Sequence, residues 1–474
     1  MTRSSSTETI CAIATPLGIG AVGIIRLSGP DALSIIGKIF SSHHGGPPGG
    51  GAAPTIEHAA SHTVHHGWMV DPASGEPVDE VLVTVMRAPR SYTREETVEI
   101  SGHGGPMVLA RTLELCLTAG ARLAEPGEFT KRAFLNGRLD LTQAEAVMAL
   151  IHAESETARR IALRQLRGDV ADSIRAIRDA LLVLLAQCEA SLDFVEQGVE
   201  ELPAERLAGR LDAIQQDLTI LLKSAQAGEL LREGIQTVIA GRPNVGKSSL
   251  FNRLLRKERA IVTPFPGTTR DLLEEMLVIN GFPLRLIDTA GIRTTPDPIE
   301  QEGLQRAHRS VEDADLVLLV LDGSQPLQPD DWLLIDTIQI NRTIIVFNKM
   351  DLCDPIDFAL VSVRLPTVPL IKLSASSGAG CDQLKEQIGR LLTERTGGMA
   401  ERAMISSSRH QQALTATADS IARARIAAAD GLSAECIACD LNEAIRQLGG
   451  VLGVDGAFTE ELLDNIFSQF CIGK

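Results

Sequence analysis

Hydrophobic positions change their spacing several times along the chain, and each change marks a different kind of structure. From residue 8 to about residue 120, short apolar runs typical of strands alternate with a helical pattern. The predicted strands cover residues 9–15, 22–29, 78–86 and 96–101, and the predicted helix covers residues 106–120. Residues 41–54 are rich in glycine and proline, which indicates a flexible insert. We therefore expect an α/β domain in this part of the chain.

The later part of the chain has a helical pattern that is interrupted. The spacing is helical over about 141–227, follows strand–loop–helix repeats over about 234–393, and is helical again over about 397–470. Such an interruption predicts one domain inserted into another, which is tolerated because the ends of a domain often lie close together. The expected class is α/β multidomain, with domain boundaries at 1–138, 139–231, 232–396 and 397–474.

Composition narrows the functional classes. The chain has 474 residues and a formal net charge of −16, whereas a general nucleic-acid binder is usually basic. Any contact with RNA must therefore use a local patch or the charge of a partner. No run of about 18 apolar residues and no apolar signal core is present, so no membrane association is expected. We expect a cytoplasmic protein whose eight scattered cysteines are reduced.

A phosphate-binding motif begins the inserted α/β segment. Gly241 and Gly246 are followed by Lys247 and Ser248, after a predicted strand at 235–240 and before a predicted helix. The glycines allow backbone N–H groups to surround a phosphate, Lys247 reaches the β- and γ-phosphates, and Ser248 binds Mg²⁺. Glycine-rich turns are common, but this spacing between a strand and a helix is specific to nucleotide-binding proteins.

Three further segments follow this motif in a fixed order, and they are Asp288–Gly291, Asn348–Asp351 and Ser374–Ala375. Asp288 would reach Mg²⁺ through water, and Gly291 would sense the γ-phosphate. Asp351 would accept two N–H bonds from guanine, a pair that adenine cannot supply; such a difference can discriminate by about 10⁴-fold. The ordered set predicts a GTPase. Its nucleotide site is expected to contain Asn244, Val245, Gly246, Lys247, Ser248, Ser249, Thr269, Asp288, Thr289, Ala290, Gly291, Asn348, Lys349, Asp351, Ser374 and Ala375.

The hydrolytic machinery departs from the simplest GTPases. Ile292 occupies the place where signalling GTPases have a glutamine that orients the attacking water. Glu300 could take that role, or it could be a solvated loop carboxylate, and the sequence leaves both open. The side-chain carbonyl of Asn244 could bind a monovalent cation, with further oxygens from 262–271. Such a cation would act as an arginine finger does, and Thr269 is the expected Mg²⁺-binding threonine of the switch.

The segments GRPNVGKSS, PGTTRD, DTAG, NKMD and LSAS resemble the TrmE–Era group of P-loop GTPases. With GHGGP, GEFTKRAFLNGRLDLTQAEA and the terminal CIGK, the resemblance to the tRNA-modifying MnmE (TrmE) family covers nearly the whole chain. It implies an N-terminal α/β domain that binds folate and forms a homodimer, and a helical domain interrupted by a Ras-like GTPase domain. The family modifies carbon 5 of the wobble uridine of certain tRNAs. It acts with the flavoprotein MnmG in a heterotetramer and with 5-formyl- or methylene-tetrahydrofolate.

The resemblance also implies roles for individual residues. Glu300 corresponds to the glutamate that orients water, and Cys471 to a reactive thiol. The implied K⁺ ligands are Asn244, Thr263, Phe265 (through its carbonyl) and Thr268. The implied folate contacts are Arg26, Glu99, Arg138 and Lys474. Arg138 stands where the family often has lysine, and a planar guanidinium is not equivalent to an ammonium group.

Several weaker patterns are assigned to structure. Gly18–Gly23 matches a dinucleotide-binding pattern, but a strand is predicted directly after it where the pattern requires a helix. Cys436 and Cys439 have no second cysteine pair to complete a zinc site, so we interpret them as buried small residues. His62, His65 and His66 border a predicted loop and are interpreted as surface side chains. Arg160, Arg164, Arg167, Arg175 and Arg178 could meet tRNA phosphates, although acidic neighbours favour a solvated face.

The terminal FCIGK does not fit a lipid anchor, because a prenylation motif ends in other residues. It is either a frayed end or a tail held by a helix with Leu462, Ile466 and Phe470 on one face.

Two other functional classes fit the sequence less well. A ribosome-assembly GTPase switch of the Era type would carry an RNA-binding module such as a KH domain, whose strand-flanked GXXG loop is missing here. A membrane-associated GTPase would carry a basic amphipathic helix, which is also missing.

Overall fold

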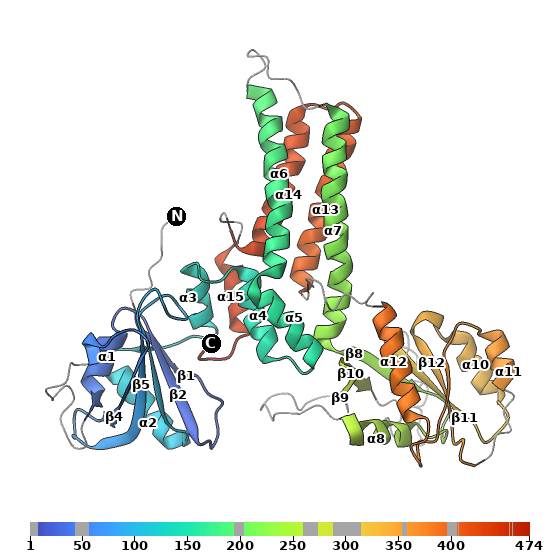
Figure 1. The fold of residues 1–474 in the computed structure, drawn as a ribbon, viewed down its shortest axis with the longest axis horizontal. Helices are drawn as coiled ribbons and strands as arrows, with labels where there is room; N and C mark the ends of the chain where they lie inside the picture. Colours follow the sequence, from blue (N-terminus) through green and yellow to red (C-terminus); the bar gives the residue numbers. More distant parts are fainter. Residues whose placement is uncertain are drawn as a thin grey trace, which may run out of the picture. The chain divides into compact units, whose positions relative to one another are not determined.

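The computed structural model describes residues 8–42, 56–193, 203–258, 274–287, 314–352, 358–395, 405, 407–454, 456 and 458–474. The chain forms two compact units. The first contains Met1–Met148 together with Arg446–Lys474, and the second contains Ala149–Ile445. The first unit therefore combines the two ends of the chain, which are blue and red in Figure 1.

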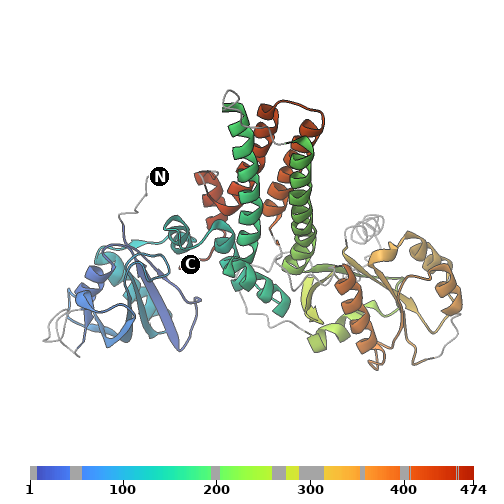
Figure 2. The ribbon, with the colours of Figure 1, turned by 45° about the horizontal axis from the view of Figure 1, so that its top comes forward.

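A seven-stranded sheet with the order β3-β4-β5-β6-β2-β1-β7 is the centre of the first unit (Figure 2). Its pairs are antiparallel except for β1 with β7. The strands are β1 (Ile10–Ile13), β2 (Val22–Ser28), β3 (Phe40–Ser41), β4 (Thr63–Val70), β5 (Pro77–Met86), β6 (Thr97–His103) and β7 (Arg122–Leu123). The helical segments are α1 (Ala32–Ile39), η1 (Ile56–His58), α2 (Pro106–Thr118), α3 (Glu128–Leu135) and α15 (Glu460–Ser468).

The two faces of this sheet have different surroundings, because successive side chains of a strand point to opposite sides. On one face Ile25 and Leu27 of β2 belong to a large core with the buried side chains of α1 and α2. On the other face Ile10 and Ala12 of β1 pack with Phe129 of α3 in a smaller cluster. Arg26 lies between Ile25 and Leu27, so it is directed to the second face. This face therefore combines a small apolar cluster with a charged side chain.

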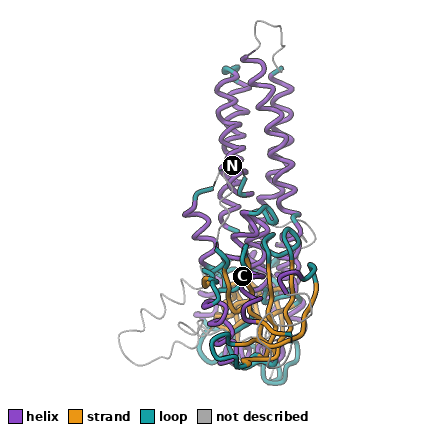
Figure 3. The backbone as a smooth tube through the Cα atoms, turned by 90° about the vertical axis from the view of Figure 1, so that its left-hand side faces the viewer, coloured by secondary structure: helices purple, strands orange, loops and turns teal. Residues whose placement is uncertain are grey.

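The second unit begins with long helices that run side by side, as the purple tubes of Figure 3 show. The long helices are α6 (Asp169–Asp193), α7 (Ala204–Glu233) and α13 (Ser408–Ala429), and the shorter helix α5 (Glu156–Arg167) precedes them; α4 (Leu141–Ile151) and α14 (Ala434–Leu452) extend across the boundary between the units. The helical pattern predicted from about residue 141 is interrupted between α4 and α5. Ser155 caps α5 by accepting a hydrogen bond from Ala158 N at 3.0 Å, and Gly168 ends α5 with a φ of 103°.

A six-stranded sheet with the order β13-β12-β11-β8-β10-β9 is inserted between α7 and α13. All its pairs are parallel except for β9 with β10. The strands are β8 (Ile235–Ala240), β9 (Glu274–Ile279), β10 (Phe282–Ile287), β11 (Leu316–Asp322), β12 (Thr343–Asn348) and β13 (Leu370–Lys372). The helical segments are α8 (Lys247–Glu258), α10 (Pro329–Thr337), η3 (Ile340–Arg342), α11 (Phe358–Arg364) and α12 (Cys381–Arg395).

Helices cover both faces of this sheet. Leu250 of α8 and Leu384 of α12 belong to the core of one face, and Ile335 of α10 and Val361 of α11 belong to the core of the other. The parallel strands β8, β11 and β12 are buried along most of their length, as expected for a sheet covered on both sides. The prediction of an α/β multidomain protein with an interrupted helical region is confirmed.

Candidate functional site

The loop between β8 and α8 adopts a conformation that few residues other than glycine tolerate. Gly241 has a φ of 145°, Asn244 of 63° and Gly246 of 99°. A Cβ atom at Gly246 would collide with Nδ2 of Asn348, so only glycine fits there. The Lys247 ammonium donates to the carbonyl oxygens of Gly241 and Arg242, at 2.8 Å each. The loop therefore encloses an ammonium group at the position where the sequence predicts a phosphate contact.

Asn348 connects this loop to the predicted base-binding loops. It ends β12, is 2% exposed, and its Nδ2 donates to Val245 O at 2.8 Å. Its Oδ1 accepts from the backbone N–H of Ala375 at 2.9 Å. The carboxyl ends of parallel strands meet at one edge of a sheet, where open α/β folds bind ligands. The structure therefore brings Val245, Asn348 and Ala375 together at this edge.

Asp351 lies exposed beside the loop that follows β13. Hydrogen bonds from the Ser374 hydroxyl, from its own backbone N–H and from the Ser376 hydroxyl lower the pKa of Asp351, and Ser376 Oγ donates to Oδ2 at 3.1 Å. The carboxylate is thus held ionised, as an acceptor of guanine N–H groups must be. Lys349 has a φ of 64°, and its ammonium donates to Asp322 Oδ2 at 2.8 Å.

Oxygen ligands of the kind that Mg²⁺ prefers are available at the start of α8, where the side chain of Ser248 is exposed. The side chains of Asn244 and Ser249 are exposed as well. The remaining predicted residues of this site lie outside the described residues. They are Thr263, Phe265, Thr268, Thr269, Asp288, Thr289, Ala290, Gly291, Ile292 and Glu300.

A second group of predicted residues meets on the N-terminal sheet. Arg26 of β2 and Glu99 of β6 are directly opposite in the antiparallel register, and they form an ion pair with an N–O distance of 2.7 Å. The Arg26 guanidinium lies 5.4 Å from the ring centroid of Tyr92 and 5.7 Å from that of Phe129. The Arg138 guanidinium also lies over this ring, 4.7 Å from its centroid, and donates to Tyr92 O at 3.0 Å. Two cations therefore share one aromatic ring.

The C-terminal residues lie at this cluster. Arg26 donates to Gly473 O at 3.4 Å, and Phe467 and Phe470 are buried. Half-burial, followed by the positive charge of Arg26, lowers the pKa of Lys474, whereas the negative charge of Glu99 acts in the opposite direction. The Cys471 side chain is exposed. The tail is therefore held against the N-terminal sheet, which answers the question of whether it is a frayed end.

The buried face of the last helix differs from the prediction. Leu463 and Phe467 of α15 are buried, whereas Leu462 and Ile466 are only half-buried. The helix is turned by about one residue from the expected orientation, because its stripe follows i, i+4 from Leu463. The expectation that a packed helix holds the tail in place does not depend on that difference.

Comparisons with known proteins agree over the whole chain. A family model described as the GTP-binding protein TrmE N-terminus matches residues 9–138, and one described as the MnmE helical domain matches residues 141–471. The tRNA modification GTPase MnmE of Carboxydothermus hydrogenoformans is 43% identical over 468 residues, which are 98% of this chain and 99% of that protein. The tRNA modification GTPase MnmE of Levilactobacillus brevis is 43% identical over 469 residues, 98% of each chain.

The chain belongs to the MnmE (TrmE) family of tRNA modification GTPases. A solved structure of Aquifex aeolicus Era bound to GDP.AlF4- is 26% identical to it, covers 39% of this chain and 66% of that one, and has a TM-score of 0.27. As a member of the MnmE family the chain is a GTPase that binds GTP and Mg²⁺. The match over its whole length does not favour the ribosome-assembly switch. Within the described residues, no helix is both long enough and apolar enough to cross a membrane.

The dinucleotide-binding pattern at Gly18–Gly23 is excluded in this MnmE-family chain, because strand β2 begins within it at Val22 and no helix follows directly. The interpretation of Cys436 and Cys439 as buried was wrong, since both are exposed on α14. Both cysteines lie on the exposed face of α14, whereas the prediction placed them on its buried face. No group of three or more metal-ligating side chains occurs in the described part of the chain.

The histidines predicted to border a loop lie at and within a strand that the sequence analysis missed. His62 precedes β4, and His65 and His66 are part of it. His66 Nε2 lies 2.8 Å from Glu80 Oε1 on the neighbouring strand. The arginines of the helical domain are partly paired, because Arg175 forms an ion pair with Asp172 at 2.7 Å.

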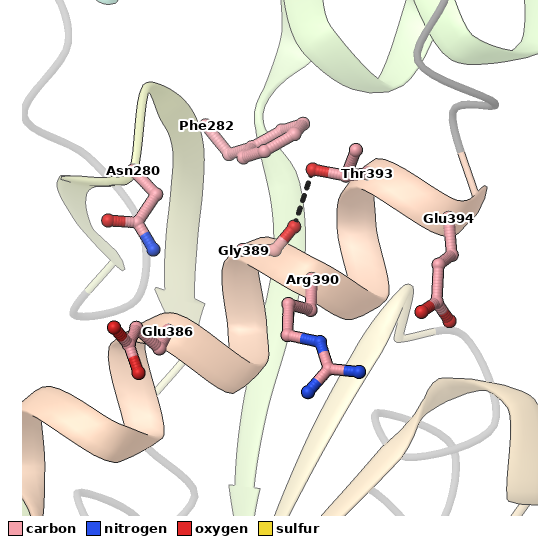
Figure 4. A pocket seen from close by; sticks show the side chains of 7 residues that line it. All are labelled: Asn280, Phe282, Glu386, Gly389, Arg390, Thr393 and Glu394. Carbon is pink, nitrogen blue, oxygen red and sulfur yellow. Dashed lines mark hydrogen bonds between the residues drawn. The ribbon is translucent and has the colours of Figure 1, made fainter.

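A cavity of about 400 Å³ lies away from the predicted nucleotide residues (Figure 4). Asn280 and Phe282 line it from the β9–β10 turn, and Glu386 and Arg390 line it from α12. The turn is at the amino end of β10, whereas the nucleotide loops follow the carboxyl ends of β8, β12 and β13. The cavity is therefore not the GTP site of this MnmE-family protein.

Sequence reasoning missed Tyr92 and Phe129, whose rings form the aromatic part of the N-terminal cluster. One signal was available for the first, because Tyr92 is the single tyrosine of the chain. Burial raises the pKa of Tyr92, while a hydrogen bond with Thr130 and the charge of Arg138 act in the opposite direction. Its phenol is therefore neutral at neutral pH.

Proposed function

We propose that this chain is a K⁺-stimulated GTP hydrolase that drives carbon-5, carboxymethylaminomethyl-type modification of the wobble uridine of certain tRNAs. In this proposal it acts with the flavoprotein MnmG and with a one-carbon tetrahydrofolate. The observation that carries the proposal is the contact of Gly473 with Arg26, whose guanidinium lies over the Tyr92 ring. This contact connects an exposed thiol, a half-buried ammonium group and an aromatic ring in one place.

The chemistry of the N-terminal cluster fits a folate. A tetrahydrofolate has carboxylates at one end and a flat ring system at the other. Lys474 and Arg138 would attract the carboxylates, and the Tyr92 ring would stack on an aromatic part of the ligand. Burial, followed by the positive charge of Arg26, lowers the pKa of Lys474, so a bound anion would relieve the repulsion between these cations. When bound, the folate supplies the one-carbon unit, and Cys471 supplies a thiol beside it.

The nucleotide site would work by positioning. Lys247 would exchange its carbonyl acceptors for the β- and γ-phosphates, and Ser248 would hold Mg²⁺. Asn348 and Asp351 would bind the edge of guanine. A monovalent cation bound through Asn244 would supply the positive charge that an arginine finger supplies elsewhere, and Glu300 would orient the attacking water.

The partners follow from the family, and one surface feature supports the homodimer. Leu17, Ile19 and Met107 are 84%, 95% and 81% exposed on the N-terminal domain. Gly20 N donates to Gly104 O at 3.0 Å, so the loop that carries Leu17 and Ile19 lies beside the loop that precedes Met107. Adjacent exposed apolar side chains are typical of protein interfaces. A second copy of the chain would cover them.

The proposal is tested by mass spectrometry of the wobble nucleosides of cells whose own gene is replaced by variants. Cys471→Ser should abolish the modification, while the purified variant should hydrolyse GTP at the wild-type rate. Cys436→Ser is the matched control, because this thiol is also exposed but lies on α14. The control should modify tRNA normally. Full modification by Cys471→Ser would show that the thiol has no chemical role.

A further inference from the structure

Arg253 links the phosphate-binding helix to the loop that follows β13. It lies on α8, six residues after Lys247, and its side chain is half-buried. Its Nε donates to Ala375 O at 2.9 Å, and its second terminal nitrogen donates to Ser376 O. One planar guanidinium therefore binds two successive carbonyl oxygens of a loop 122 residues away in the sequence.

That loop is closed on itself by backbone hydrogen bonds. Ser374 N donates to Ala379 O at 2.9 Å, and Gly378 N donates to Ser374 O at 2.8 Å. Gly378 has a φ of 90°, which the turn requires. Two bonds within the loop and two from Arg253 therefore fix both its shape and its place.

The loop in turn holds the two side chains expected to recognise guanine. The N–H of Ala375 fixes the amide of Asn348, whose other end is bound to Val245 O. The hydroxyl of Ser376 fixes the carboxylate of Asp351. Arg253 binds the carbonyls of these same two loop residues. A displacement of the loop would therefore move the amide and the carboxylate together.

We propose that Arg253 is the positioning residue for guanine recognition in this GTPase. It fixes the loop of residues 374–376, and through this loop it orients Asn348 and Asp351 toward the base. The inference rests on the assignment of these two side chains to guanine in the proposed function. It adds a third residue, on the helix that begins at the phosphate loop, which couples phosphate binding to base recognition.

The test measures base discrimination rather than binding alone. GTP and inosine triphosphate differ by the 2-amino group, one of the two donors that a carboxylate at Asp351 would accept. In Arg253→Ala two hydrogen bonds to the loop are lost, and we expect the affinity ratio of GTP to inosine triphosphate to fall about 10-fold. The dissociation rate of GDP should rise by a similar factor. Affinities of both triphosphates are measured on the full chain by fluorescence titration.

Two further variants make the result specific. Asn252→Ala removes an exposed neighbour on the same helix and should leave the ratio unchanged. Arg253→Lys keeps the charge but lacks the planar pair of donors, so it should restore the ratio only in part. It also replaces Arg253→Ala as the test variant if the alanine variant does not fold.

The proposal is overturned if the folded Arg253 variants weaken GTP and inosine triphosphate equally, because Arg253 would then only stabilise the domain. Wild-type discrimination in the variants would overturn it as well. Failure of the underlying assignment has a different signature. If Asp351→Asn does not change base preference, the guanine site lies elsewhere, whatever the Arg253 variants do.

Discussion

Replacing Gly473 with alanine is expected to lift residues 471–474 from the N-terminal sheet without disturbing GTP hydrolysis. A Cβ atom at this position would lie 2.5 Å from Ile13 O and 3.0 Å from Ala14 Cα. Both neighbours are backbone atoms at the end of β1, so neither can turn aside as the end of a flexible side chain would. Gly473 also has a φ of 95°, which L side chains rarely adopt.

The size of the effect follows from the strained backbone and from the collision of the added Cβ atom. The left-handed backbone alone costs an alanine about 1–2 kcal/mol. A carbon–oxygen contact is normally about 3.3 Å or longer, so the overlap with Ile13 O must be relieved by moving the tail. A loss of about 2 kcal/mol of docking free energy lowers the docked population about 30-fold relative to the undocked one. In the proposed function Lys474 would contact folate only from the docked tail, so folate affinity should fall, by up to about 30-fold.

The measurement is calorimetric titration of the purified protein with 5-formyltetrahydrofolate, with GTP hydrolysis as the second readout. Gly75→Ala is the matched control. Gly75 has a φ of 74° in the same domain, but a Cβ atom there would meet nothing within 4 Å. The Gly75→Ala variant has the backbone strain without the collision, so it should bind folate normally. Wild-type folate affinity in Gly473→Ala would refute the docking argument, and an equal loss in Gly75→Ala would assign the effect to strain in the domain.

Three further outcomes are expected. Asp351→Asn should shift preference from GTP to xanthosine triphosphate, because the donor–acceptor pattern at the base edge inverts; competition binding measures this, and unchanged preference for GTP contradicts it. Hydrolysis in K⁺ should exceed that in Na⁺ by up to about 10³-fold, and Asn244→Ala should remove the difference in a steady-state assay; equal wild-type rates in both salts would eliminate the cation site. Glu300→Ala should slow single-turnover hydrolysis while GTP affinity stays within about twofold of wild type; a large loss of affinity would place Glu300 in binding.

The phosphate loop was predictable because its requirements are local. Gly241 and Gly246 stand where the backbone takes positive φ values, and the motif records that need within a few residues. Asn348 was found for the same reason, since the strand before it and the residues after it form one short motif. Strand β2 was predicted at nearly its observed bounds because apolar residues alternate along it.

The features that the sequence did not reveal are contacts between residues far apart in the chain, or elements whose hydrophobic pattern is weak. Tyr92 and Arg253 act through residues far along the chain, and no local spacing records such a pairing. Strand β4 was missed because its first half is polar and exposed, with Val64 59% exposed. Cys436 was assigned to the wrong face of α14 because cysteine is usually buried, and that average says nothing about a particular helix.

The contact between Arg26 and Gly473 joins residues that are 447 positions apart. A ribosome makes the chain from its N-terminus, and domains generally fold as they emerge. The N-terminal sheet can therefore form early, but the cluster around Tyr92 lacks its C-terminal part until residues 471–474 have been synthesised. A chain cut short between α12 and residue 471 would contain all elements of the nucleotide domain but an unfinished N-terminal cluster. Completion of this cluster thus requires synthesis of the chain as far as Gly473.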